Sequence, residues 1–435
     1  MSKKTIDFRY NTGSSAVPWA AVGENYSAQD ILDVVEFLMQ GEGDTYTIAL
    51  AKVKNALTEL AVVGKAPGKL SLGEKVSQLE KELDEYLGVE ESTFVTNATA
   101  GFEIAFRYAN LKEGDEVLIP AITFIATMAY PLAVGAKVVF VDVDPETLNM
   151  DPKDMERKIT DRTKMVIPVH IGGYPVDMDP VMELAEKHDL VVLEDAAHGF
   201  GGTYKGRQLG TIGHFGAYSF HEVKNITSFG EGGVLVSTLP FRKDLKKARF
   251  LGLDMSTAIK DWLYDVTALE GKEGYFAANN SSSTELQAVG LLSQMSRYEE
   301  ILAIRKRNVL YLNERLAGCD AVKTQPIGRD GSEPTYHLYL LQIDPEKAGA
   351  DIRVLRKKLA EKSVTTIPHF APLYKFTIMK QLGYDQAAEE LACPVAEDVF
   401  YHKFTHLPVY GLSKDQLDYM ADAVLASIDE MQKGI

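Results

Sequence analysis

The decisive stretch of this sequence is Ser219-Phe-His-Glu-Val-Lys-Asn-Ile-Thr-Ser-Phe-Gly-Glu-Gly-Gly233. The pattern indicates a buried strand that ends at a hydroxyl, a lysine five residues later, and a glycine-rich turn into the next strand. A lysine near the carboxyl edge of a buried sheet is partly desolvated, which lowers its pKa and makes its amine nucleophilic. Lys224 is therefore a candidate for a Schiff base with an aldehyde. The alternative is a solvated loop lysine, the more common situation for this residue type.

Short apolar runs rich in β-branched residues alternate with helical stretches around this lysine. The runs are 116–119, 137–142, 165–170, 190–195, 217–221 and 233–237. Most of them are apolar throughout, which is typical of strands buried on both faces. Strands that alternate with helices predict a mostly parallel α/β sheet, whose ligands bind beyond the carboxyl ends of the strands.

A carboxylate ends one of these runs, in Leu193-Glu-Asp-Ala-Ala-His198. Asp195 is therefore expected at the same sheet edge as Lys224, where it could pair with the cationic ring nitrogen of pyridoxal phosphate and preserve the electron sink of that cofactor. The alternative is an N-cap for the next helix. His198 follows three residues later, where a structural histidine with satisfied hydrogen bonds is the more common outcome.

Two further segments follow predicted strands. Thr96-Asn-Ala-Thr-Ala-Gly101 leads into a helical stretch, and small residues with a hydroxyl at a helix start form an anion cradle of backbone N–H groups. Ala121-Ile-Thr-Phe-Ile-Ala-Thr127 places Phe124 after a strand, where its ring could stack on a planar cofactor. The alternative for Phe124 is core packing.

Composition excludes several classes of protein. The 435 residues carry 46 Lys and Arg against 62 Asp and Glu, a formal charge of −16, which disfavours nucleic-acid and anionic-membrane binding. The only two cysteines, Cys319 and Cys393, form no CxxC pair, so we expect no disulfide framework, no cysteine-rich metal site and a reducing, cytoplasmic setting. The N-terminus lacks the apolar run of a signal peptide. We interpret the uncharged stretch 117–136 as a strand, a turn and a helix in a soluble core.

Helical patterns dominate the N-terminal part. A capping box at Ser27 and Asp30 predicts a helix that stops near Gly41, and a second helix is expected over 45–63. A loop at 64–68 precedes a third helix that closes at Gly88.

The C-terminal part predicts a smaller α+β lobe. A long helical pattern from Thr284 to about Leu316 leads into it. The lobe itself is expected to contain an extended run at 336–342, a helix near 351–362 and a second extended run at 364–367. The charge run 242–249 predicts a solvated helix face.

In order and strand context, the chain resembles the nucleotide-sugar aminotransferases, a family of fold type I enzymes that use pyridoxal phosphate. The resemblance covers about residues 70–430. The segments that carry it are Thr96-Asn-Ala-Thr-Ala-Gly101, Gly114-Asp-Glu-Val117, Thr123-Phe-Ile-Ala-Thr127, Arg162-Thr-Lys164, Pro168-Val-His170, Asp177-Met-Asp179, Glu194-Asp-Ala-Ala-His198, Ser219-Phe-His221, Lys224-Asn225, Gly230-Glu-Gly-Gly233, His369-Phe-Ala-Pro-Leu373 and Leu407-Pro408. Within the family, the aminotransferase that makes UDP-4-amino-4-deoxy-L-arabinose is similar in the Asn-Ala-Thr-Ala-Gly and Lys-Asn-Ile-Thr segments.

The resemblance implies a division of the chain into three parts. An N-terminal arm with a helical insertion would occupy residues 1–70. A large cofactor-binding domain with a mostly parallel seven-stranded sheet would span 71–310, and a smaller C-terminal domain 311–435. The resemblance also implies a homodimer with shared active sites.

The resemblance implies roles for eight residues. Lys224 would carry the cofactor, Asp195 would hold its pyridinium nitrogen, and His198 would face the ring hydroxyl. Phe124 would stack on the ring. The cofactor phosphate would be held by Ala98, Thr99 and Ser219, and Asn280 is the candidate to reach into the partner's site. No metal is implied. Ser282 stands where relatives often carry an Arg or Asn, so the substrate is least defined around this loop.

The expected reaction moves an amino group from an amino acid, glutamate in the first instance, to a keto-sugar that is nucleotide-linked. Three alternatives stay open. They are amination of a carbocyclic ketone (an inosose or the precursor of an aminohydroxybenzoate), sugar 3-dehydration, and a regulatory protein that binds the cofactor without turnover. A dehydratase of this family carries a histidine in place of the lysine, so Lys224 argues against that reaction.

Overall fold

The computed structural model describes residues 26–64, 70–257, 259–260, 262, 264–328 and 330–434. Contacts between residues divide the chain into two units, Met1–Leu70 with Met255–Asp265, and Ser71–Asp254 with Val266–Ile435. The N-terminal arm before residue 26, and with it the expectation about a signal peptide, lies outside the described residues, as does most of the predicted loop at 64–68. No helix within the described ranges is long and apolar enough to cross a membrane.

The first unit contains a pair of helices, α1 (Ala28–Leu38) and α2 (Asp44–Val63). The predicted capping box is confirmed, because the Ser27 side chain accepts from the Asp30 N–H while the Asp30 carboxylate accepts from the Ser27 N–H. Within the pair, only Leu32 is buried, and α2 buries no residue. The two helices therefore form their backbone hydrogen bonds without burying an apolar core between them.

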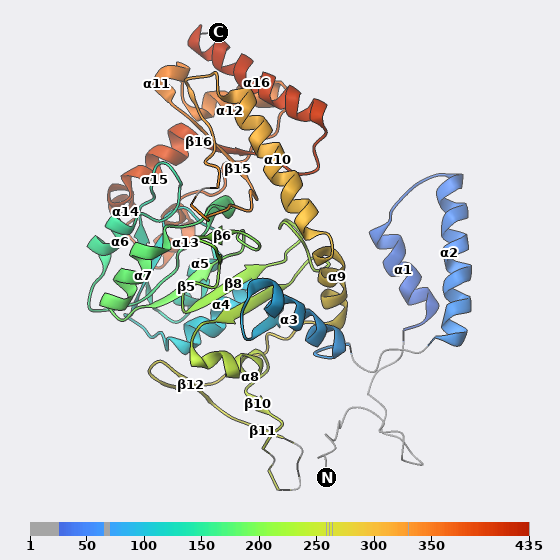
Figure 1. Cartoon of the computed structure of the whole chain (residues 1–435). Helices are drawn as coiled ribbons and strands as arrows, with labels where there is room; N and C mark the ends of the chain where they lie inside the picture. Colours follow the sequence, from blue (N-terminus) through green and yellow to red (C-terminus); the bar gives the residue numbers. More distant parts are fainter. Residues whose placement is uncertain are drawn as a thin grey trace. The chain divides into compact units, whose positions relative to one another are not determined.

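The second unit is built on a seven-stranded sheet flanked by helices (Figure 1). Its strands are β1 (Ser92–Val95), β2 (Glu116–Pro120), β3 (Lys137–Val141), β4 (Thr163–Val166), β5 (Val191–Asp195), β8 (Phe215–Ser219) and β9 (Gly233–Ser237). They lie in the order β1-β9-β8-β5-β4-β2-β3, and only β9 runs antiparallel to its neighbours. The predicted mostly parallel α/β sheet is confirmed, although β1 was not among the predicted runs.

Helices and short pairs surround this sheet. The helices of the large lobe are α3 (Glu74–Leu87), α4 (Ala98–Tyr108), α5 (Ala126–Ala133), α6 (Pro152–Lys158), α7 (Met178–Lys187), α8 (Leu245–Arg249), α9 (Glu285–Met295) and α10 (Tyr298–Leu316). Two-stranded pairs are formed by β6 (Thr203–Tyr204) with β7 (Arg207–Gln208), β10 (Leu253–Asp254) with β11 (Asp265–Val266), and β12 (Leu269–Gly271) with β13 (Gly274–Phe276).

Alternate residues of the strands build two different cores. Val117, Ile119 and Leu193 belong to the apolar cluster that includes α4 and α5, whereas Leu118 and Val192 belong to the cluster that includes α6 and α7. Both sets are fully or almost fully buried. Burial on two faces explains why the strands are apolar throughout and why their polar residues gather at the carboxyl ends.

The C-terminal lobe has a small antiparallel sheet in the order β14 (Val322–Lys323), β15 (Tyr339–Ile343) and β16 (Phe404–Leu407). Around it lie α11 (Pro345–Ala348), α12 (Ile352–Glu361) and α16 (Lys414–Gln432). The same part of the chain contains α13 (Thr377–Gln381), α14 (Gln386–Ala392) and α15 (Pro394–Asp398), but Met379 of α13 and Ala396 of α15 pack in the core cluster of β2 and α4. The lobe shares α10 with the large lobe, because Tyr298 packs in a cluster with β8 and β9, while Val309 and Leu312 pack with β15 and α16.

Three predictions of secondary structure need correction. The pattern from 284 to 316 forms two helices, α9 and α10, because the backbone breaks at 296–297. The run 364–367 forms no strand and makes a single bridge between Ile367 and His406. The charge run 242–249 is not a fully solvated face, because Arg249 is buried and ion-paired with Glu80 of α3.

A buried carboxylate fixes the strand that carries the predicted acid. Glu194 of β5 is fully buried and accepts four hydrogen bonds. The donors are the N–H groups of Gly210 at 2.9 Å, Ile212 at 2.6 Å and Gly213 at 2.6 Å, and Nε2 of His170 at 3.0 Å. The Val176 N–H donates to Nδ1 of His170, so the His170 proton is on Nε2, facing the carboxylate. A charge that is satisfied in this way holds β5 in place.

Candidate active site

Lys224 lies in the turn between β8 and β9, at the carboxyl edge of the sheet. Its backbone N–H bonds to the carbonyl of His221 at 2.9 Å, which fixes the turn. Burial lowers the pKa of the amine to about 8, against the opposing effect of the negative charge on Asp195. Among the described residues, the Lys224 Nζ has no hydrogen-bond or ion-pair partner. A pKa of about 8 leaves the amine mainly protonated near pH 7 but raises its neutral, nucleophilic fraction far above that of an ordinary lysine.

Asp195 ends β5 and is buried. One of its carboxylate oxygens accepts from the Ala197 N–H at 3.0 Å. Burial raises the pKa of the carboxyl, while that hydrogen bond and the charge of Lys224 oppose the rise. An acid in this position gains stability from a cation placed against it, and the protonated nitrogen of a pyridine ring is such a cation.

His198 lies buried between the two lobes. Its Nδ1 accepts from the Gly172 N–H at 3.3 Å, so the ring proton is on Nε2. Its ring stacks on His337 at 4.3 Å and lies nearly parallel to Phe370 at 6.2 Å. Burial lowers its pKa well below the usual value, and the positive charge of Lys224 adds to the effect. His198 is thus a neutral hydrogen-bond donor, which suits a ring hydroxyl.

The segment predicted to hold an anion begins α4. Asn97 caps the helix by accepting from the Ala100 N–H at 2.9 Å, and the first N–H groups of a helix, here those of Ala98 and Thr99, have no partner within it. Ser219, at the end of β8, pairs with Gly233 in the sheet. Gly233 lies so close to Asn97 that an added Cβ would be 2.3 Å from the carbonyl carbon of Asn97. The glycine therefore lets Ser219 approach the helix N-terminus.

Phe124 and Asn280 differ from the other predicted residues. Phe124 is 55% exposed with its ring centroid 6.0 Å from that of Phe370, so it is not a core residue. Asn280 is exposed, and its side-chain oxygen accepts from the Ser282 N–H at 3.1 Å. No interaction between Asn280 and Lys224 or Asp195 is found in the described part of the chain.

Lys224 is one of the residues that line a small cavity. The lining also includes Ser219, His198, Asn225 and Tyr298. These residues come from the β8–β9 turn, the end of β8, the segment after β5 and the start of α10. The cavity therefore joins residues that the sequence places far apart.

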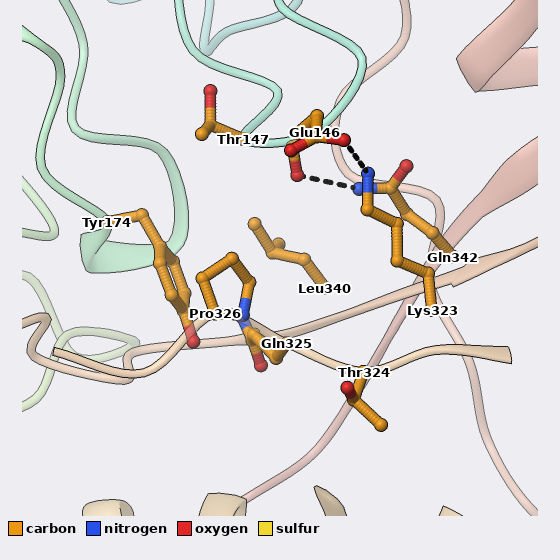
Figure 2. A pocket seen from close by; sticks show the side chains of 9 residues that line it. All are labelled: Glu146, Thr147, Tyr174, Lys323, Thr324, Gln325, Pro326, Leu340 and Gln342. Atoms are coloured by element: carbon orange, nitrogen blue, oxygen red, sulfur yellow. Dashed lines mark hydrogen bonds and ion pairs between the residues drawn. The ribbon is translucent and has the colours of Figure 1, made fainter. Parts of the chain in front are cut away.

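A second cavity contains none of the predicted residues. Figure 2 shows it with Glu146 at one rim, bonded through its carbonyl to Gln342 at 3.2 Å and paired through its carboxylate with Lys323 at 3.6 Å. The Tyr174 hydroxyl and the Gln325 side-chain oxygen in its lining are buried without a partner among the described residues. We assign this cavity to the packing between the lobes and not to catalysis.

Three histidines without a role assigned from sequence, His337, His369 and His406, come from the C-terminal part of the chain, and two of them interact electrostatically with Lys224. His337 bonds to Asn225 at 2.6 Å between Nδ1 and Oδ1, and His369 Nδ1 lies 2.9 Å from His406 Nε2. Burial lowers the pKa of both His337 and His369, and the positive charge of Lys224 adds to the effect. No local sequence pattern indicated these contacts. His337 and Asn225 are 112 residues apart in the chain, and His369 and His406 are 37 residues apart.

The assembled set suits pyridoxal phosphate. Lys224 offers an amine for the cofactor aldehyde, Asp195 an acid for its ring nitrogen, and His198 a donor for its ring hydroxyl. The start of α4 and Ser219 offer N–H and O–H groups for its phosphate.

Comparisons with known proteins find a matching family model and similar relatives. The model of the DegT/DnrJ/EryC1/StrS aminotransferase family matches residues 43–425. The spore coat polysaccharide biosynthesis protein SpsC of Bacillus subtilis is 35% identical over 375 residues, which cover 82% of this chain and 90% of SpsC. A putative L-glutamine:3-amino-2,3-dideoxy-scyllo-inosose aminotransferase of Streptoalloteichus tenebrarius is 35% identical over 366 residues, 80% of this chain and 84% of that protein.

Solved structures show the same similarity. The putative sugar aminotransferase Spr1654 of Streptococcus pneumoniae superposes in its PMP form with a TM-score of 0.73 at 27% identity, covering 84% of this chain and 94% of that one. Its PLP form superposes with a TM-score of 0.72 at the same identity and with the same coverage of both chains.

Proposed function

We propose that this chain, which belongs to the DegT/DnrJ/EryC1/StrS aminotransferase family, moves an amino group from glutamate to the ketone of a nucleotide-linked sugar. The chain is a pyridoxal phosphate-dependent aminotransferase with a fold type I architecture. The observation that carries the assignment of the site is that Lys224, a partly buried amine, lines one cavity with Ser219 and His198 and lies near enough to the buried Asp195 for each charge to shift the pKa of the other. The setting we propose is the cytoplasm.

The proposed roles follow from the geometry. When bound, pyridoxal phosphate supplies an aldehyde that takes up the amino group and a ring that accepts the electrons of a broken C–H bond. Lys224 would hold the cofactor, and its Nζ would act as base and then as acid once the amino donor has displaced it. Asp195 would keep the ring nitrogen protonated, His198 would donate from Nε2 to the ring hydroxyl, and Phe124 would cover the ring.

The lowered pKa of Lys224 predicts how the protein takes up its cofactor. Binding of pyridoxal phosphate to cofactor-free protein should accelerate as the pH rises through about 8 and then level off, because only the neutral amine attacks the aldehyde. The measurement is the initial rate of appearance of the cofactor's visible band between pH 6 and pH 11. A midpoint near 10.5, the ordinary value for lysine, would contradict the role of burial at this site.

Two substrate classes compete. Membership of a sugar aminotransferase family and the similarity to a polysaccharide biosynthesis protein support the nucleotide-linked keto-sugar. The 35% identity to a putative inosose aminotransferase named for L-glutamine supports a carbocyclic ketone and a glutamine donor as the second candidate. The presence of Lys224 disfavours sugar 3-dehydration, in which relatives use a histidine at this position.

A panel assay separates these candidates. Purified protein loaded with pyridoxal phosphate is incubated with glutamate or glutamine and with either keto-sugar nucleotides or keto-cyclitols. We expect 2-oxoglutarate to be released from glutamate with at least one keto-sugar nucleotide. Turnover with keto-cyclitols alone would select the second candidate, and turnover with no ketone would favour a regulatory protein.

We also propose a homodimer that shares its active sites, with Asn280 reaching the site of the partner. Large apolar side chains support it, because Phe229, Leu286 and Val289 are exposed and Phe229 lies against Gly290 of α9. Exposed apolar groups of this size mark surfaces that another protein covers.

A further inference from the structure

A hydrogen bond joins the residue after the lysine to the segment that leads into β15. Oδ1 of Asn225 lies 2.6 Å from Nδ1 of His337, so the amide oxygen accepts from the imidazole N–H. Asn225 and Lys224 line the same small cavity as Tyr298, whose hydroxyl donates to the carbonyl of Phe200.

His337 is held from two other sides. Its ring stacks on the ring of His198 at 4.3 Å and 29°. Its carbonyl accepts from Nη1 of Arg305 at 3.1 Å, and the Arg305 guanidinium lies over the Tyr410 ring at 4.6 Å. His337 is also buried, with 9% of its surface exposed. A side chain restrained on all these sides has little rotational freedom, so it can hold a hydrogen-bonded neighbour in one orientation.

We propose that His337 is a positioning residue, which orients Lys224 through its hydrogen bond to the adjacent Asn225. The residue lies just before β15 of the C-terminal lobe, so this bond ties that lobe to the turn that carries the lysine. The inference rests on the proposed role of Lys224. It deepens that role by naming what keeps the amine pointed at the cofactor aldehyde.

Two substitutions separate the hydrogen bond from the ring. His337→Phe keeps an aromatic ring for His198 but cannot donate to Asn225, whereas His337→Asn keeps an N–H at the place of Nδ1 and loses the ring. We expect His337→Phe to lower the rate of amino transfer from glutamate to the bound cofactor about tenfold, with little change in KM, which is the scale of one hydrogen bond. The visible circular dichroism of the bound cofactor should also weaken, because the lysine is no longer held in one orientation.

His337→Asn should retain both the rate and the dichroism. Asn225→Ala should reproduce His337→Phe, and the double variant should be no worse than either single one, because both remove the same bond. His402→Phe, at a partly exposed histidine near Asp351, is the matched control and should behave as wild type.

Two results would overturn the inference. One is unchanged dichroism and rate in both His337→Phe and Asn225→Ala, and the other is a loss in His337→Asn equal to that in His337→Phe. The wild-type protein separates this failure from that of the proposed function. If borohydride leaves no cofactor adduct on Lys224 of the wild type, the site assignment fails, whereas an adduct at Lys224 together with unaffected variants removes only the role of His337.

Discussion

Replacing Lys224 by alanine is expected to lower turnover about a thousandfold or more, because the protein then loses both the covalent anchor for its cofactor and the group that moves the proton. The fold should persist. The Lys224 Nζ has no hydrogen-bond or ion-pair partner among the described residues, and removing a partly buried amine relieves an unfavourable desolvation. The measurements are steady-state turnover and the thermal unfolding midpoint of the cofactor-free protein.

The cofactor itself provides a second readout of Lys224→Ala. The visible band should be absent, and reduction with borohydride followed by mass spectrometry should find no adduct in the peptide that contains residue 224. Lys187→Ala, at an exposed lysine paired with Glu156, should retain activity and adduct. Near-normal turnover of Lys224→Ala would show that the nucleophile lies elsewhere and would remove the basis of the proposed function.

Replacing Asp195 by alanine is expected to lower turnover about a hundredfold to a thousandfold, which is the usual loss when one buried electrostatic contact to a reacting group is removed. Without the carboxylate, the ring nitrogen of the cofactor loses its proton and becomes a weaker electron acceptor. The Ala197 N–H loses its acceptor at the same time, so cofactor-free stability should be measured alongside.

A cofactor analogue tests the reason for that loss. N-methylated pyridoxal phosphate has a permanently cationic ring nitrogen, and the alanine leaves room for the methyl group. It should restore part of the activity of Asp195→Ala and none of the activity of Lys224→Ala. Asp161→Ala, at an exposed aspartate, is the control and should behave as wild type. An Asp195→Ala protein with undiminished turnover would contradict the assigned role of the carboxylate.

The sheet and the central pair of the site could be predicted because they depend on local patterns. Fully apolar runs mark strands buried on both faces, and the parallel arrangement brings their carboxyl ends to one edge. Asp195 and Lys224 follow such runs, so their proximity follows from the fold class. The resemblance to a known family added Ala98, Thr99 and Ser219, which we propose hold the phosphate. The need for glycine at 233 could not be predicted, because it depends on the close approach of Asn97.

The features that were missed depend on contacts distant in sequence. Arg249 lies in a charged run, but its partner Glu80 comes from α3, and the same carboxylate accepts from the Phe94 N–H at 3.0 Å. The strand β1 is short and begins with Ser92, whose N–H bonds to Asp84. His337 gave no signal either, because its neighbours in the chain form an ordinary strand while its side chain contacts Asn225.

The two adjacent acids of β5 also protect the chain against misalignment during folding. Consecutive strand residues point to opposite faces, so a slip by one position would exchange the surroundings of Glu194 and Asp195. The slipped strand would leave the three N–H groups from 210–213 facing the wrong side chain, and His170 would lose its acceptor. Only one alignment satisfies those donors, and in the same alignment Asp195 ends β5 at the sheet edge where we propose that the cofactor binds.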